Sequence, residues 1–299
     1  MKKQINQLKR EKNAVILAHY YAPAEVQEIA DHVGDSFYLA KIAKQSTADI
    51  IVFCGVYFMG ESAKILNPGK KVLMPDLTAD CAMAHMVAPG LIDEMRKKYE
   101  DLAVVCYINS TAELKCQSDV CVTSSNAVQI IQNLPNQNIF FIPDRHLGSF
   151  VAEQVPEKNI ILNDGCCPVH TKMTAEQVME EKRKHPGALV LSHPECSPEV
   201  LLVSDFIGST ADIISFAKTS DASELIICTE VGVDHQLIAD SPDKRFYFPN
   251  PHPCCADMKR NTLARVLSVL EHEDHIVEVP DEIRQRALIP LDRMLELAK

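Results

Sequence analysis

Apolar and polar residues alternate along this chain in blocks that recur every 86–88 residues. Residues 91–111 show the design, in which an amphipathic helix pattern leads into an apolar strand pattern. Residues 6–21 and 176–196 repeat it. Recurrence at a fixed interval indicates one structural unit used three times. Helices that alternate with fully apolar strands predict parallel sheets covered by helices.

Each block continues with a helix start rich in small residues and then two more apolar strands. The helix starts occupy 34–44, 122–132 and 208–218, and the second strands occupy 50–56, 138–144 and 224–230. The third strands occupy 70–76, 158–164 and 244–250. We therefore expect an α/β fold with three homologous αβα sandwich domains, whose parallel sheets are arranged about a pseudo-threefold axis.

The expected domains are residues 1–83, 84–170 and 171–256. After them, residues 261–280 look like the start of a fourth helix–strand copy. We expect the C-terminal segment, 257–299, to pack against the first repeat and so close the ring.

Composition narrows the class of function. Hydrophobic residues make up 46% of the 299 residues and charged residues 24%, which is typical of folded domains and excludes long disorder. The net charge of −11 is spread along the chain, which argues against a nucleic-acid partner because such proteins need clusters of Lys and Arg. The longest uncharged apolar stretch, 50–60, is much shorter than the roughly 20 residues of a spanning helix, so no membrane partner is expected.

The chain has 11 cysteines, which need an explanation. The N-terminal residues contain no export signal, so we expect a cytoplasmic protein whose thiols stay reduced. An odd number of cysteines in a reducing compartment argues against a disulfide framework. Metal ligation or catalysis is the usual alternative.

A cysteine follows the last predicted strand of each block. Cys81, Cys167 and Cys255 are spaced by 86 and 88 residues. Ligands bind at the carboxyl ends of parallel strands, so three units around one axis would bring these thiols together. Three thiolates can hold a 4Fe–4S cluster and leave one iron open as a Lewis acid. Spacing alone leaves open whether Cys166 or Cys167, and Cys254 or Cys255, is the ligand.

Polar residues recur at two further places in each block. Ser36, Ser124 or Ser125, and Ser209 with Thr210 lie at the helix starts, where Ser and Thr cap helices and where phosphate or carboxylate binds. The other set follows the first strands and has the residue types of acid–base catalysis: His19, Tyr20, Tyr21, Tyr107, Asn109, His193 and Glu195.

Together these motifs resemble the quinolinate synthase family, in order and over essentially the whole chain. They are AHYY (18–21), GDS (34–36), DCAMA (80–84), YINST (107–111), TSSNAV (123–128), PDRHLG (143–148), CPVH (167–170), HPEC (193–196), GST (208–210), TEVG (229–232) and the Cys-x-x-Met-Lys-x-Asn-Thr-Leu run at 255–263. The resemblance implies three αβα domains around a 4Fe–4S cluster held by three cysteines. It also implies condensation of iminoaspartate with dihydroxyacetone phosphate to quinolinate, with loss of phosphate and two waters, in de novo NAD biosynthesis.

Matched motif by motif, the resemblance implies Cys81, Cys167 and Cys255 as cluster ligands. It implies proton transfer by Tyr21, Tyr107 and Glu195. The residues that it implies for substrate binding are His19, Ser36, Asn109, Ser124, His193, Ser209 and Thr210. Iminoaspartate would come from an enzyme that oxidises aspartate, by free diffusion or by handover, and the oligomeric state is left open.

Other residues carry less specific expectations. His170 and His252 are near cluster cysteines and are expected to support them. Cys54, Cys106 and Cys228 lie inside apolar strands and are expected in the core. Two rival functions use part of the same pattern: a hydro-lyase for another polyanionic hydroxy acid, and a non-enzymatic iron–sulfur sensor or carrier.

Overall fold

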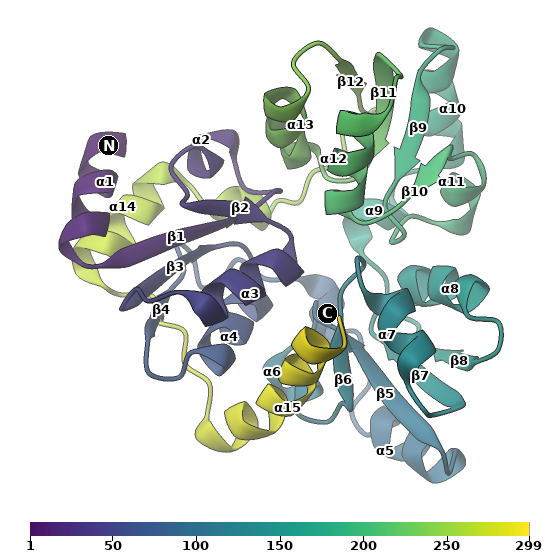
Figure 1. Cartoon of the computed structure of the whole chain (residues 1–299), viewed down its shortest axis with the longest axis horizontal. Helices are drawn as coiled ribbons and strands as arrows, with labels where there is room; N and C mark the ends of the chain where they lie inside the picture. Colours follow the sequence, from purple (N-terminus) through teal and green to yellow (C-terminus); the bar gives the residue numbers. More distant parts are fainter. Residues whose placement is uncertain (299) are drawn as a thin grey trace.

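Figure 1 shows the computed structural model, which describes residues 1–298 as three parallel sheets set around a centre. Every sheet has four strands, and along each sheet the order is second, first, third, fourth. All strand pairs within the sheets are parallel. This architecture confirms the expected α/β class with three αβα units.

The strands of the first sheet are β1 (Ala14–His19), β2 (His32–Gly34), β3 (Ile50–Cys54) and β4 (Lys71–Leu73). Those of the second are β5 (Leu102–Tyr107), β6 (Val120–Val122), β7 (Asn138–Ile142) and β8 (Asn159–Leu162). The third sheet has β9 (Leu189–Ser192), β10 (Phe206–Ile207), β11 (Glu224–Cys228) and β12 (Arg245–Tyr247).

The helices that flank the first sheet are α1 (Lys2–Glu11), α2 (Ala24–Gln27), α3 (Ser36–Gln45) and α4 (Tyr57–Leu66). Around the second are η1 (Ala82–His85), α5 (Leu91–Lys98), α6 (Ala112–Lys115), α7 (Ala127–Asn133), α8 (Arg145–Gln154) and α9 (Pro168–Thr171). The remaining helices are α10 (Ala175–Lys184), α11 (Pro198–Leu202), α12 (Thr210–Thr219), η2 (Val231–Val233), α13 (Asp234–Asp240), η3 (Met258–Arg260), α14 (Leu263–His272) and α15 (Asp281–Leu297).

The sequence predicted three strands in each repeat, whereas the structure has four. The missed strands, β2, β6 and β10, have only two or three residues and form one edge of each sheet. Each directly adjoins a predicted helix start (34–44, 122–132 and 208–218) and does not stand out from it, whereas β4 and β12, also short, lie within longer apolar runs.

One aspartate fixes each of these edge strands in the same way. Before each edge strand, an aspartate carboxylate accepts a hydrogen bond from a backbone N–H of the first strand. The three pairs are Asp31 with Ile16 (2.8 Å), Asp119 with Val104 (2.7 Å) and Asp205 with Val190 (2.8 Å). The repeat visible in the sequence therefore extends to individual hydrogen bonds.

The hydrophobic core is not shared equally by the three repeats. One cluster of buried residues runs continuously from the first repeat, through residues such as Phe53, to the second, through residues such as Phe140. The third repeat has two clusters of its own, around Ile213 and around Val200. The expected core cysteines, Cys54, Cys106 and Cys228, are fully buried.

The C-terminal segment packs on two repeats. Helix α14 contacts α1 and β3 of the first repeat. After it, Val277 donates its N–H to the Val72 carbonyl (2.8 Å) and Ile276 forms an antiparallel bridge with Leu73. We expected the whole segment against the first repeat, but α15 instead lies mainly on α6 and β6 of the second and also touches α4 (Figure 1). Among the described residues, no helix combines the length and the apolar character needed to cross a membrane.

Candidate active site

The carboxyl ends of the three sheets surround one cavity of about 410 Å³. Its lining includes residues from all three repeats and from the segment after β12. Twelve of the thirteen expected site residues line it: His19, Tyr21, Ser36, Cys81, Tyr107, Asn109, Ser124, Cys167, His193, Glu195, Thr210 and Cys255. Ser209 is the exception, because its hydroxyl is hydrogen-bonded to the Asp212 carboxylate (2.6 Å) instead.

The helix starts differ from the expected capping pattern. Asp35, and not Ser36, caps α3 by accepting the Tyr38 N–H (2.8 Å). Asn126, and not Ser124, is the N-cap residue of α7, while Ser209 does cap α12. Asp and Asn fill the cap as well as Ser does, so a nearby Ser is not diagnostic. Ser36 and Ser124 are consequently not used as caps, and both face the cavity.

The turns after β1 and β9 share one hydrogen bond. The Tyr21 N–H donates to His19 Nδ1 (3.1 Å), and the Glu195 N–H donates to His193 Nδ1 (3.2 Å). Burial lowers the pKa of both histidines to about 3, so both imidazoles are neutral. Because Nδ1 accepts, Nε2 carries the proton, and in His193 it lies 3.2 Å from the Ser124 hydroxyl.

Tyr21 is a partly buried, neutral phenol at the junction of repeats. Its hydroxyl lies 2.6 Å from the Thr210 hydroxyl and 2.7 Å from the Thr229 hydroxyl, both on the third repeat. Burial, followed by the charge of Glu195, raises the pKa of Tyr21 well above its usual value. The phenol can therefore donate a proton to a developing anion at neutral pH.

Glu195 has the opposite electrostatic setting. Burial alone would raise its pKa, but the His170 ring, whose Nδ1 lies 2.7 Å from Oε2, outweighs burial and lowers the pKa to about 2. The carboxylate is thus ionised and can act as a base. Its Oε1 is buried without a hydrogen-bond partner, as is Oδ1 of Asn109. Two buried acceptors in the cavity suit a ligand that donates hydrogen bonds.

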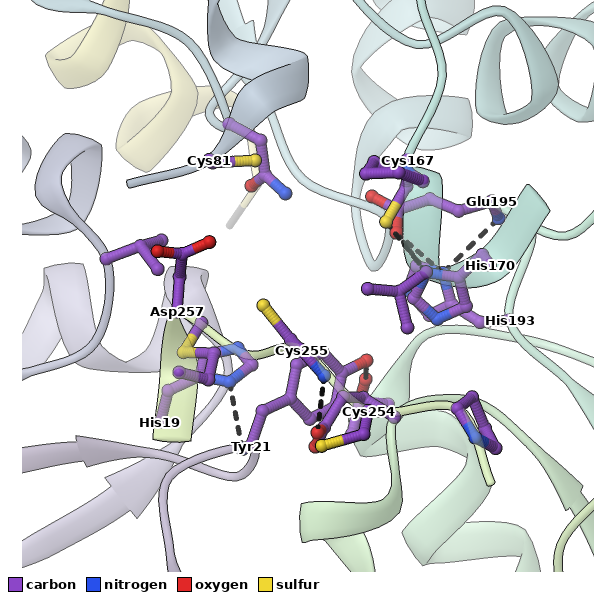
Figure 2. Close-up of a pocket in the computed structure, with 18 of the residues that line it drawn as sticks. His19, Tyr21, Cys81, Cys167, His170, His193, Glu195, Cys254, Cys255 and Asp257 are labelled. Carbon is purple, nitrogen blue, oxygen red and sulfur yellow. Dashed lines mark hydrogen bonds and ion pairs between the residues drawn. The ribbon is translucent and has the colours of Figure 1, made fainter. Parts of the chain in front are cut away.

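Three cysteines approach one open space from three sides, as Figure 2 shows for Cys81, Cys167 and Cys255. Each cysteine N–H donates to a carboxylate: Asp80 (2.7 Å), Asp144 (3.2 Å) and Glu230 (3.0 Å), in that order.

Burial raises the pKa of all three thiols, to about 12 for Cys81. Negative charge on one sulfur also raises the pKa of a neighbouring thiol. Charge on Cys255 raises the pKa of Cys81, and charge on Cys81 raises the pKa of Cys167. Partly buried thiolates that repel one another are stabilised by a bound cation, so this donor set fits a metal centre.

The cysteine doublets differ in position. Cys166 does not line the cavity, whereas Cys167 does. Cys254 and Cys255 both line it, but Cys254 is exposed and its sulfur points away from the space that the other three share (Figure 2). His170 Nδ1 lies 3.2 Å from the Cys167 sulfur, whereas the His252 ring lies against Phe248.

A buried ion pair that the sequence analysis missed supports both Cys255 and Tyr21. Lys259 Nζ lies 2.8 Å from Glu230 Oε1 and donates to the Tyr21 carbonyl (2.7 Å). The Gly232 N–H donates to the same carboxylate (2.6 Å), and a Cβ on Gly232 would lie 2.8 Å from the Tyr21 Cα. Only glycine allows this approach. The TEVG and Cys-x-x-Met-Lys motifs contain these residues, but spacing alone gives them no role.

Comparison with known proteins agrees with this geometry. The family model described as "Quinolinate synthetase A protein" matches residues 3–296. A quinolinate synthase of Caldicellulosiruptor saccharolyticus is 51% identical over 298 residues, covering 100% of this chain and 98% of the relative.

Two other relatives carry the same name. That of Fusobacterium nucleatum is 53% identical, covering 100% of this chain and 99% of the relative. That of Clostridioides difficile is 49% identical, covering 99% of this chain and 97% of the relative. From its sequence and its site alike, this chain belongs to the quinolinate synthetase A family.

Proposed function

We propose that this chain is a quinolinate synthase of de novo NAD biosynthesis. It condenses iminoaspartate with dihydroxyacetone phosphate to quinolinate, releasing phosphate and two waters. The observation that carries the proposal is the pairing, in one cavity, of an ionised carboxylate and a neutral phenol with three facing cysteines. Family membership supports the same reaction.

Cys81, Cys167 and Cys255 would hold a 4Fe–4S cluster and leave one iron without a protein ligand. When bound, the cluster supplies a Lewis acid that makes a substrate hydroxyl a better leaving group. The three carboxylates that accept the cysteine N–H groups orient the ligand loops.

Polar groups that line the cavity bind the substrates. The hydroxyls of Ser36, Ser124 and Thr210, with the His193 Nε2–H, offer donors to phosphate and carboxylate oxygens. Asn109 Oδ1 offers an acceptor to the amine or to a hydroxyl. His19, neutral and buried, positions the Tyr21 turn through its Nδ1. Ser209 contributes as the cap that fixes Thr210 at the start of α12.

Proton transfers are divided between two groups. Glu195, ionised and with Oε1 free, removes a carbon-bound proton when the condensed chain isomerises. Tyr21, kept neutral, donates to the oxygen that leaves as water. Tyr107 lines the same cavity, and burial, followed by the charge of Glu195, raises the pKa of that phenol as well. Water loss and ring closure then need no group from outside the cavity.

The test is an anaerobic assay of quinolinate formation with iron and sulfide analysis of each variant. Tyr21→Phe and Glu195→Gln should each lower turnover by at least about 100-fold with unchanged iron content, because general acid–base catalysis contributes 10²–10⁴-fold. Tyr99→Phe and Glu224→Gln, outside the cavity lining, serve as matched controls. Wild-type turnover in either site variant would refute these roles.

The same assay separates the rival functions. An iron–sulfur protein that makes no quinolinate but dehydrates another polyanionic hydroxy acid would be a hydro-lyase. One with iron and no turnover of either kind would be a sensor or carrier. We propose a cytoplasmic setting, where iminoaspartate from an aspartate-oxidising enzyme would be available.

A further inference from the structure

Three side chains of the cavity bring a sulfur, a nitrogen and a carboxylate oxygen to one point. His170 Nδ1 lies 2.7 Å from Glu195 Oε2 and 3.2 Å from Cys167 Sγ. All three donor atoms lie within 4.8 Å of one another. The side chains of His170 and Glu195 are 2% and 4% exposed. Neither Cys81 nor Cys255 is part of this group.

The far side of the His170 ring is also fixed. Its Nε2 lies 2.9 Å from the hydroxyl of Thr229, which is itself completely buried. This contact points Nδ1 toward Cys167 and Glu195. A histidine that binds a metal through one ring nitrogen usually donates a hydrogen bond from the other, and Thr229 is placed to accept it.

One carboxylate oxygen of Glu195 is free to bind a ligand. Oε2 is paired with His170, whereas Oε1 is buried without a partner. A cysteine sulfur, a histidine nitrogen and a carboxylate oxygen are the ligands that Zn²⁺ takes, at about 2.0–2.3 Å in a tetrahedral set. Small side-chain rotations that bring the three donor atoms to about 3.3–3.6 Å from one another would admit the ion, with its fourth position facing the cavity.

We propose that the cluster-free protein binds one Zn²⁺ ion through Cys167 Sγ, His170 Nδ1 and the Glu195 carboxylate. Binding releases the Cys167 thiol proton to solvent, and the proton that His170 Nδ1 shares with Glu195 moves to Nε2, where the Thr229 hydroxyl accepts it. The zinc ion and the iron–sulfur cluster exclude each other, because the Cys167 sulfur is needed by both. The zinc form is also inactive, because Glu195 is then a ligand and not a base. Exclusion and inactivity rest on the proposed function, whereas zinc binding itself does not.

The test uses the full-length chain, freed of metal under anaerobic conditions and titrated with Zn²⁺ against a chromophoric chelator. One equivalent per chain is expected. Cys167→Ser, His170→Gln and Glu195→Gln should each weaken zinc binding by at least about 10-fold. Cys81→Ser and Cys255→Ser should leave zinc affinity within about 2-fold of wild type while preventing cluster assembly. Co²⁺ in place of Zn²⁺ should show a sulfur-to-cobalt absorption band that Cys167→Ser alone, among the cysteine variants, removes.

Two outcomes overturn the zinc site. Loss of zinc affinity in Cys81→Ser equal to that in Cys167→Ser would place the ion among the three cysteines. Unchanged affinity in both His170→Gln and Glu195→Gln would remove those ligands. Thermal unfolding of each metal-free variant identifies any that fails to fold, and Cys167→Ala and His170→Asn then replace it.

A separate measurement tests exclusion. Zinc-loaded protein supplied with iron and sulfide should take up no cluster until a chelator removes the zinc. A chain that holds both one zinc and a full cluster would disprove exclusion. If the variants show the expected zinc affinities while the protein makes no quinolinate, with or without its cluster, that result would support the zinc site and refute the proposed function.

Discussion

The first and second repeats meet through apolar side chains, whereas the third meets its neighbours largely through polar ones. One continuous core, with α15 inserted into it, joins the first two. The third repeat keeps its own cores and is joined through Thr229, Glu230 and the rings of Tyr20 and Tyr21. We call the apolar contacts between the first two repeats the apolar seam, and the polar contacts of the third repeat with its neighbours the polar seam. The apolar seam fixes the shape of the cavity wall. The polar seam contains hydrogen bonds to residues of the candidate site, namely Tyr21, Cys255 and His170.

Lowering the pH should disrupt the polar seam before it disrupts the apolar seam. His19 and His193 lie on opposite sides of it, and burial lowers the pKa of each from 6.5 to about 3. Between these values the unfolded chain binds more protons than the folded one, so stability falls as pH is lowered from 6.5 toward 3. The loss should be about 2.7 kcal/mol per pH unit for the two residues together.

Urea unfolding of the metal-free protein at a series of pH values measures this slope. His19→Gln should roughly halve it, whereas His272→Gln, an exposed histidine of α14, should leave it unchanged. A slope that His19→Gln does not alter would contradict the assignment.

Lys259→Met should be the most damaging single change to the polar seam. It leaves the Glu230 carboxylate, whose side chain is 1% exposed, without its cation. Breaking such a buried pair costs about 3–5 kcal/mol of unfolding free energy. Lys244→Met is the matched control, because Lys244 Nζ donates only to carbonyls such as that of Ala217. Equal destabilisation by both variants would show that the Glu230 charge is not decisive.

Leu291→Ala tests the apolar seam. Leu291 of α15 is fully buried in the core shared by the first two repeats, and removing its side chain should cost about 3 kcal/mol through lost burial and a residual cavity. Ile289, on the same helix but 66% exposed, is the control, and Ile289→Ala should stay within about 0.5 kcal/mol. Chemical denaturation measures both, and a loss below 1 kcal/mol for Leu291→Ala would mean that α15 is not part of the core.

Ser209→Ala should have the smallest effect. The hydroxyl caps α12 within a reciprocal pair with Asp212, and losing such a cap costs about 1 kcal/mol. Because Ser209 does not line the cavity, the Michaelis constants for both substrates should change little. Steady-state kinetics beside an unfolding curve decide this, and a large rise in either Michaelis constant would make Ser209 a direct substrate ligand.

The sequence predicts the long, buried elements of this fold because their apolar runs leave a pattern. It misses β2, β6 and β10, since these short strands directly adjoin the predicted helix starts and do not stand out from them. It misplaces the caps of α3 and α7, because the Asp35 carboxylate caps α3 and the N-cap residue of α7 is Asn126, whose side chain makes no capping hydrogen bond. It gives no role to Glu230 and Lys259, which meet only after the third repeat folds against the first.

Candidate site residues were predictable where the same residue type recurs at matching positions of different repeats. His19 and His193 recur at matching strand ends, and three cysteines recur at matching intervals. Thr229 and His170 have no such counterparts, so their contact with Tyr21 and Glu195 could be found only in three dimensions.

Helix α15 is made after the three repeats, yet it fills a space between elements of the first two. At ribosomal rates of roughly 5–20 residues per second, about 10 s pass between completion of the second repeat and emergence of this helix. During that time the nascent chain carries an uncovered slot that Ala287, Leu291 and Met294 later fill. Chaperone dependence of this protein should therefore be concentrated in that interval, and a stop codon shortly before α15 should yield an aggregating product and not a smaller enzyme.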